Sequence, residues 1–148
     1  FVQLQDPMAR NIVHAGHGHL AASFGDAIGP IAFSSIVTSS ETIAKRPELV
    51  SRFMRAYSQT RHWIDATYAA GIAQAIRPWF EDTDMSVLVD SIDGYKRLGS
   101  WTRNTAITRD AFAAAMQMML HSPDLTGVTE SYTYEQCCND AFALAVDA

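Results

Sequence analysis

Three histidines lie within six residues, in the segment His14–His19 (HAGHGH), and imidazole is a common ligand of transition-metal ions. A metal site needs its imidazoles fixed at one point, and the well-defined zinc spacings place them on one helix face or combine them with cysteines or carboxylates. Here two glycines loosen the backbone between the histidines, and no cysteine lies nearby. We therefore predict a polar surface loop at this segment, with no metal and no other cofactor.

Residue patterns for covalent catalysis are equally weak. The two cysteines, Cys137 and Cys138, are neighbours within a predicted helix, which is typical of buried and unreactive thiols. The sequence contains neither a Gly-x-Ser-x-Gly nucleophile motif nor a glycine-rich phosphate-binding loop. We predict no catalytic residues, and hence a protein that is not an enzyme.

The segment Phe33-Ser34-Ser35 is a better candidate for ligand binding. A strand that is followed by a turn and a helix start brings hydroxyls and free backbone N–H groups together, which suits a small polar or anionic ligand. Local hydrogen bonding by Ser34 and Ser35 is the competing interpretation. On these residues alone, both interpretations stay open.

Composition narrows the class of protein. The chain has 148 residues, of which 48% are hydrophobic and 18% are charged, as expected for one globular domain that needs no disulfide or metal to hold its core. A net charge of -5 without a basic cluster argues against nucleic acid and anionic membranes as partners. The chain begins without Met, inside the alternating phrase Phe1–Gln5, so we expect it to be part of a longer protein.

Two stretches have the composition of strands, Phe1–Gln5 and Ile31–Thr38, and the sequence becomes helical from about residue 38 onward. Capping residues and helix-ending glycines or prolines predict the helices. They are a helix capped by Thr38 that runs through Lys45, a helix at 47–64, a helix at about 69–76, one between Asp84 and Gly99, one capped by Thr108, and one from Thr133 through Ala145.

The second of these helices carries a long apolar stripe, which predicts a buried helix. The stripe consists of Val50, Phe53, Met54, Tyr57 and Ile64, widened by Leu49, Ala56 and Trp63. Phe53 lies in its middle and is expected to be buried. Trp79 and Trp101 lie at helix ends, where packing and ligand stacking are both open interpretations.

The order of several phrases resembles a known family. The phrases are Leu4–Pro7, Gly16–His19, Gly29–Ser39 and Arg46–Tyr57. Together they resemble the C-terminal half of periplasmic solute-binding proteins of ABC importers, of the nitrate, sulfonate and taurine type that also includes binders of thiamine-pyrimidine precursors. The resemblance continues to Glu135 and covers nearly the whole chain.

The resemblance implies an α/β fold, in which the chain is a helix-rich fragment of a two-lobed type II periplasmic binding protein. Residues 1–29 would end the second lobe, residues 30–39 would form an interlobe strand, and residues 40–148 would pack as a helical part on the first lobe. The N-terminal part of such a protein is absent from this sequence. The histidine segment would then be an incidental loop or helix end.

The resemblance also implies a function. The protein would be a monomer in the periplasm or lipid-anchored at the cell surface, capturing a small organic solute for a membrane permease. Its ligand-binding residues would include Asp6, Pro7, Phe33, Ser34 and Ser35. An enzyme of thiamine-pyrimidine synthesis and a metal-binding or sensory module that uses His14–His19 are the alternatives.

Overall fold

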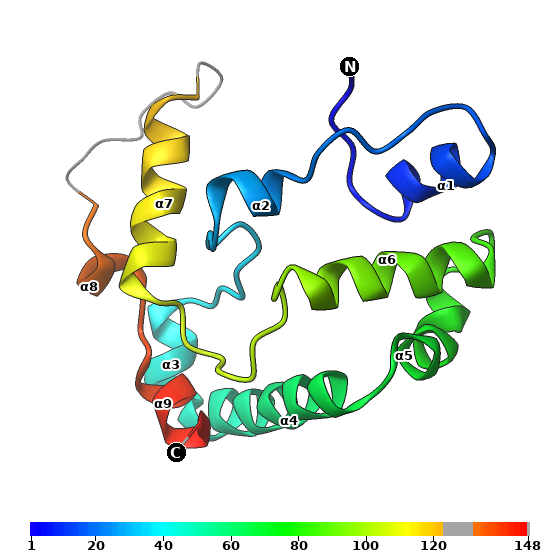
Figure 1. The fold of residues 1–148 in the computed structure, drawn as a ribbon. Coiled ribbons are helices and arrows are strands. Elements are labelled where there is room, and N and C mark those ends of the chain that lie inside the picture. The colour runs from blue at the N-terminus through cyan, green and yellow to red at the C-terminus, as the bar shows by residue number, and fades with distance from the viewer. Residues whose placement is uncertain (123–131, 148) are drawn as a thin grey trace. The chain divides into compact units, whose positions relative to one another are not determined.

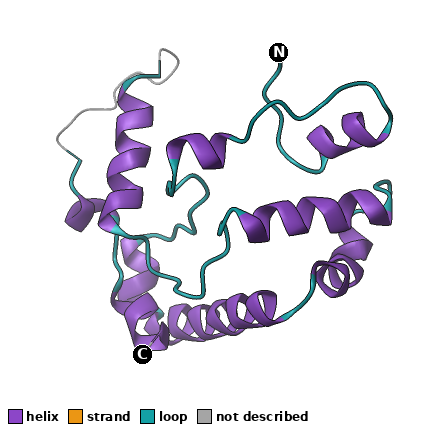
Figure 2. Cartoon of the chain, viewed as in Figure 1, coloured by secondary structure: helices purple, strands orange, loops and turns teal. Residues whose placement is uncertain are grey.

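The computed structural model describes residues 1–122 and 132–147, and every regular element in this part of the chain is helical (Figures 1 and 2). The elements are α1 (Met8–His14), α2 (Phe24–Ile28), α3 (Ser40–Lys45), α4 (Pro47–Ala66), α5 (Ala69–Ile76), the 3-10 turn η1 (Arg77–Trp79), α6 (Met85–Arg97), α7 (Arg109–Leu120), α8 (Tyr134–Cys137) and α9 (Ala141–Asp147). No described helix is both long enough and apolar enough to cross a membrane.

The chain divides into two compact units. Unit 1 consists of Phe1–Ala27 and His62–Thr102, and unit 2 consists of Ile28–Arg61 and Arg103–Ala148. Helix α4 begins in unit 2 and ends in unit 1.

The core of unit 1 lies where α5 packs against α6. Ile72 and Ala73 of α5 and Leu88 and Ile92 of α6 are buried there. Leu88 and Ile92 are four residues apart and therefore share one face of α6. Partly buried side chains surround this core, namely Ile64, Ala69, Ile76, Phe80, Met85, Val89 and Trp101. The open question for Trp101 is thereby answered in favour of packing.

Lys96 ties α6 to the C-terminal end of α4. Its ammonium group donates hydrogen bonds to the carbonyl oxygens of Ile64 (2.6 Å), Asp65 (3.1 Å) and Thr67 (2.8 Å). Carbonyls at a helix C-terminus lack intrahelical partners and carry the negative end of the helix dipole. One lysine therefore satisfies three acceptors and neutralises part of this charge.

In unit 2, local capping and aromatic contacts hold the helices. Thr108 accepts a hydrogen bond from the Ala111 amide (3.2 Å) at the start of α7, as predicted. Thr133 and Gln136 form the predicted capping box at α8. The Tyr134 ring meets Phe112 of α7 edge-on at 5.6 Å, and its hydroxyl donates to the Ile107 carbonyl (2.6 Å).

The helix predictions are confirmed from residue 40 to residue 120, with one correction. The α5 bounds agree with the prediction, and α6 begins after Asp84. Helix α3, however, is capped by Ser39 and not by Thr38, because the Ser39 hydroxyl accepts the Thr42 amide hydrogen bond (3.1 Å). The undecided segment after Pro7 forms α1, and α2 was not predicted.

The two strand predictions are wrong in this structure. Residues 1–5 and 31–38 form neither strands nor helices. A strand requires ladder hydrogen bonds to a neighbouring strand. The described residues form no strand that could pair with either segment. The Ala32 amide donates instead to the Ala111 carbonyl of α7 (3.0 Å). The α/β fold and the interlobe role of residues 30–39 stay predictions.

The last predicted helix is divided at the cysteine pair. Cys138 has extended backbone angles and ends α8, and the Asn139 side chain accepts a hydrogen bond from the Ala141 amide (3.2 Å) where α9 begins. Cys137 is exposed and Cys138 is partly buried, so the prediction of two buried thiols is wrong. Burial raises the pKa of the Cys138 thiol, and the neighbouring Cys137 adds to this effect.

The predicted burial of α4 is also wrong, although its helical extent is confirmed. Within α4, which is described completely, the buried residue is Ser58. Phe53 is 49% exposed and stacks on Tyr57 with ring centroids 6.3 Å apart, and Trp63 is exposed as well. Helical spacing determines which side chains share a face, but a second element must cover that face to bury it.

Two leucines of unit 1 differ in burial, so their replacement by alanine should lower the free energy of unfolding by different amounts. Leu88 is 2% exposed, whereas Leu98 is 38% exposed. Leu88→Ala should lower the free energy of unfolding by about 2–5 kcal/mol, because it leaves a cavity in the core. Leu98→Ala should cost clearly less. Chemical denaturation measures both variants, and equal losses would contradict the assigned core.

The two lysines of the sequence provide a second comparison. Lys96→Met keeps the aliphatic stem but removes the ammonium from three carbonyls, and should cost about 1–3 kcal/mol. Lys45 pairs with Glu41 at the surface, with both side chains at least 70% exposed, so Lys45→Met should cost less than about 0.5 kcal/mol. Thermal and chemical denaturation test this difference. An unchanged free energy of unfolding in the Lys96→Met variant would show that other contacts hold the end of α4.

Candidate functional site

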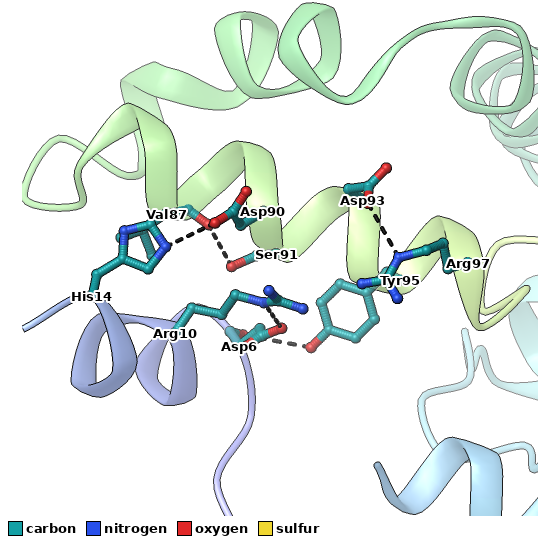
Figure 3. A network of polar contacts seen from close by, with 9 residues as sticks. All are labelled: Asp6, Arg10, His14, Val87, Asp90, Ser91, Asp93, Tyr95 and Arg97. Carbon is teal, nitrogen blue, oxygen red and sulfur yellow. Dashed lines mark hydrogen bonds and ion pairs between the residues drawn. The ribbon is translucent and has the colours of Figure 1, made fainter. Parts of the chain in front are cut away.

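The candidate site is a polar network between α1 and α6 in unit 1 (Figure 3). We call it the Asp6 site and define it by Asp6, Arg10, Gly94 and Tyr95. Asp6 directly precedes the first turn of α1, and Arg10 follows one helical turn later. Gly94 and Tyr95 belong to α6, which packs in the core through Leu88 and Ile92. Two residues of the site thus lie on α6, which the core holds in place.

Helix α1 presents Asp6 and Arg10 to α6 because of its local sequence. Pro7 occupies the N-cap position, and its carbonyl accepts the first helical hydrogen bond from the Asn11 amide (2.9 Å). The partly buried Ile12 and Val13 give the helix one apolar side. Gly16 has a φ of 73° and follows the last turn, where glycine avoids the strain of a left-handed conformation.

One oxygen of the Asp6 carboxylate is paired, and the other is buried without a partner. Arg10 Nε donates to Asp6 Oδ2 (3.2 Å), and these side chains are 18% and 17% exposed. The Tyr95 hydroxyl donates to the backbone carbonyl of Asp6 (3.5 Å). Asp6 Oδ1 is buried and has no hydrogen-bond partner among the described residues. Buried polar atoms are nearly always paired, so this oxygen is unusual.

Gly94 makes room for the Arg10 guanidinium. A Cβ added at Gly94 would lie 2.8 Å from Arg10 Nη2 and 3.8 Å from Asp6 Oδ2. Glycine within a helix costs about 1 kcal/mol relative to alanine. The close approach of the guanidinium to the α6 backbone gives a physical reason for glycine at this position.

Tyr95 acts in the network as a hydrogen-bond donor. Burial raises the pKa of its phenol, the nearby Asp6 carboxylate raises it further, and the hydrogen bond to the Asp6 carbonyl partly offsets both effects. The hydroxyl therefore keeps its proton at neutral pH. The Tyr95 ring lies 5.3 Å from that of Trp101, which links the site to the edge of the core.

The histidine segment contributes one residue to this interface. His14 ends α1, and its Nε2 lies 2.8 Å from Asp90 Oδ2 on α6, which is a second link between the two helices (Figure 3). His17 and His19 are exposed. Among residues 1–122 and 132–147, no three His, Cys, Asp or Glu side chains gather as they would around a metal ion.

The sequence-predicted ligand residues fall into two groups. Asp6 and Pro7 lie together at the start of α1 in unit 1. Phe33, Ser34 and Ser35 are exposed neighbours in irregular chain of unit 2. The turn at Asp6 and the spacing of Asp6 and Arg10 are visible in the sequence. No local signal connects Asp6 with Gly94 or Tyr95, and these two residues were missed.

Two ion pairs with the same spacing test the energetic role of burial at this site. Arg10–Asp6 and Arg97–Asp93 each join Nε to Oδ2 at 3.2 Å within one helical turn, but the second pair is 68% and 59% exposed. Arg10→Met should cost about 1–3 kcal/mol, since it leaves a mostly buried carboxylate unpaired.

Arg97→Met should cost less than about 0.5 kcal/mol, as exposed pairs usually do. Urea denaturation of both variants measures the difference. Similar costs for the two variants would mean that Asp6 is solvated in solution.

Comparison with known proteins gave a match to a named bacterial protein. No family model and no solved structure matches the chain. The chain is 27% identical over 143 residues to a Bacillus subtilis protein named "Putative binding protein YtlA". The match covers 97% of this chain but 42% of the relative, so the chain spans less than half of that protein's length.

Proposed function

We propose that this chain is part of the solute-binding component of an ABC importer, which captures a small organic solute and passes it to a membrane permease. The observation that carries the proposal is the 27% identity along 97% of the chain to a protein named as a binding protein. That name specifies binding alone. The importer class rests on the resemblance of Gly29–Ser39 and Pro47–Tyr57 to solute-binding proteins.

The proposed fold is the helix-rich portion of a two-lobed α/β protein. Residues 1–29 would end the second lobe, residues 30–39 would cross between lobes, and residues 40–148 would pack on the first. The strand-like composition of Ile31–Thr38 and its exposed Phe33, Ile36 and Val37 favour this assignment, because such residues are stabilised by pairing into a sheet. The unmatched part of the longer relative leaves room for that sheet.

The proposed ligand is a sulfonate, nitrate, taurine or pyrimidine-precursor type of solute, held between lobes in the periplasm or at the cell surface. Binding stabilises a closed state because the solute contacts both lobes, and no covalent chemistry is required. Asp6 and Pro7 would contribute from the residues before and at the start of α1. Phe33, Ser34 and Ser35 would contribute an apolar wall and two hydroxyls.

A bulky substitution tests the proposed contact at residues 33–35. In the full-length protein, Ser35→Trp should weaken solute binding at least about tenfold, or about 1.4 kcal/mol, because the indole fills space that the solute needs. Ser86→Trp, at an exposed serine on α6, is the matched control and should bind normally. Calorimetric titration with nitrate, taurine and 4-aminopyrimidine provides the measurement, and circular dichroism confirms folding.

The 148-residue chain alone should bind the same solute weakly or not at all, because part of the proposed cleft lies outside it. An unchanged affinity in the Ser35→Trp variant would remove this segment from the binding site. Failure of the full-length protein to bind any probe of the panel would contradict the proposed function.

A further inference from the structure

The strongest unexplained feature of unit 1 is the buried oxygen of Asp6. Asp6 Oδ1 has no hydrogen-bond partner among the described residues, although an ionised carboxylate oxygen is a strong acceptor. Leaving such an atom buried and unpaired is costly. Its presence beside a hydrogen-bonded network therefore points to a donor from outside the described chain.

Two neighbouring donors bind acceptors other than Oδ1. Arg10 Nε donates to the other carboxylate oxygen, Oδ2, and the Tyr95 hydroxyl donates to the Asp6 backbone carbonyl. Gly94 lets the Arg10 guanidinium lie against α6, which keeps the carboxylate oriented. One oxygen is thus fixed while the other keeps its full capacity to accept a hydrogen bond.

The carboxylate also lies close to the surface of the unit. The Asp6 side chain keeps 17% of its area exposed. Asp6 does not belong to the α5–α6 core, so a ligand that binds this carboxylate does not need to open that core.

We propose that Asp6 accepts a hydrogen bond from an N–H group of the solute, so that the solute carries an amino or ammonium group. This inference rests on the proposed function and narrows its solute class. An ionised carboxylate has no proton to donate to nitrate or to an alkanesulfonate that lacks an amino group. Its negative charge also repels both anions. Taurine-like and aminopyrimidine-like solutes meet the requirement.

Matched ligand pairs test the proposal directly. The full-length protein is titrated calorimetrically with taurine and ethanesulfonate, and with 4-aminopyrimidine and pyrimidine. Within each pair the molecules differ by the amino group. We expect binding by the amino member of one pair, and at least tenfold weaker binding by its partner.

A matched protein variant completes the test. Asp6→Asn keeps the shape of the side chain but replaces one acceptor with a donor, and should weaken binding of the amino-bearing probe at least tenfold. Asp93→Asn alters the exposed pair of the same spacing, and should leave the affinity unchanged. Circular dichroism and thermal denaturation confirm that both variants fold.

Two results would overturn the inference. One is tight binding of ethanesulfonate or nitrate that Asp6→Asn does not weaken, which leaves the importer function intact. The other is a loss of thermal stability in Asp6→Asn with unchanged affinity, which would assign the oxygen to a structural water. Absence of binding by every probe to the wild-type protein would reject both this inference and the proposed function.

Discussion

The packing of α6 on α5 is the constraint on which the rest of unit 1 depends. Leu88 and Ile92 bury one face of α6, and each fully buried aliphatic side chain contributes about 1.5–3 kcal/mol. With that face fixed, Lys96 reaches the end of α4, and Gly94 and Tyr95 reach the start of α1. The apolar contacts of α6 fix which of its faces is turned toward α1 and α4, and thereby position its polar contacts.

Burial, more than geometry, determines what the charged groups of this chain can do. The Arg10–Asp6 and Arg97–Asp93 pairs have the same spacing and the same separation of 3.2 Å. The exposed pair competes with water and contributes little. The mostly buried pair withdraws a carboxylate from water and leaves one oxygen unpaired, which is a suitable state for recognising a hydrogen-bond donor.

Unit 2 is organised differently, since the buried hydrophobic side chains among its described residues are the small Ala115 and Ala143. Tyr134 connects α8 to α7 through its ring and its hydroxyl. Arg109 lies over the Tyr134 ring and pairs with Glu135, which raises the pKa of the guanidinium and lowers that of the carboxylate. This pair is exposed, so it contributes orientation more than stability.

The sequence by itself determined the helices from α3 to α7 and the start of α8, because their signals are local. Thr108, the Thr133–Gln136 box and the glycines and prolines at helix ends act on residues within one turn, and a reader of the sequence can find them. The turn at Asp6 and Pro7 was equally visible. Ligand contacts at Phe33, Ser34 and Ser35 stay a prediction that rests on the resemblance of Gly29–Ser39 to solute-binding proteins.

Tertiary structure alone decided which predicted faces are covered. The apolar stripe of α4 contains Phe53, but no described element buries that side chain, and Ile31–Thr38 has strand composition but no strand to pair with. The Asp6 site joins Asp6 to Tyr95 across 89 positions of sequence. Burial and pairing depend on which distant segment of the chain packs against a residue, and the local sequence does not specify that segment.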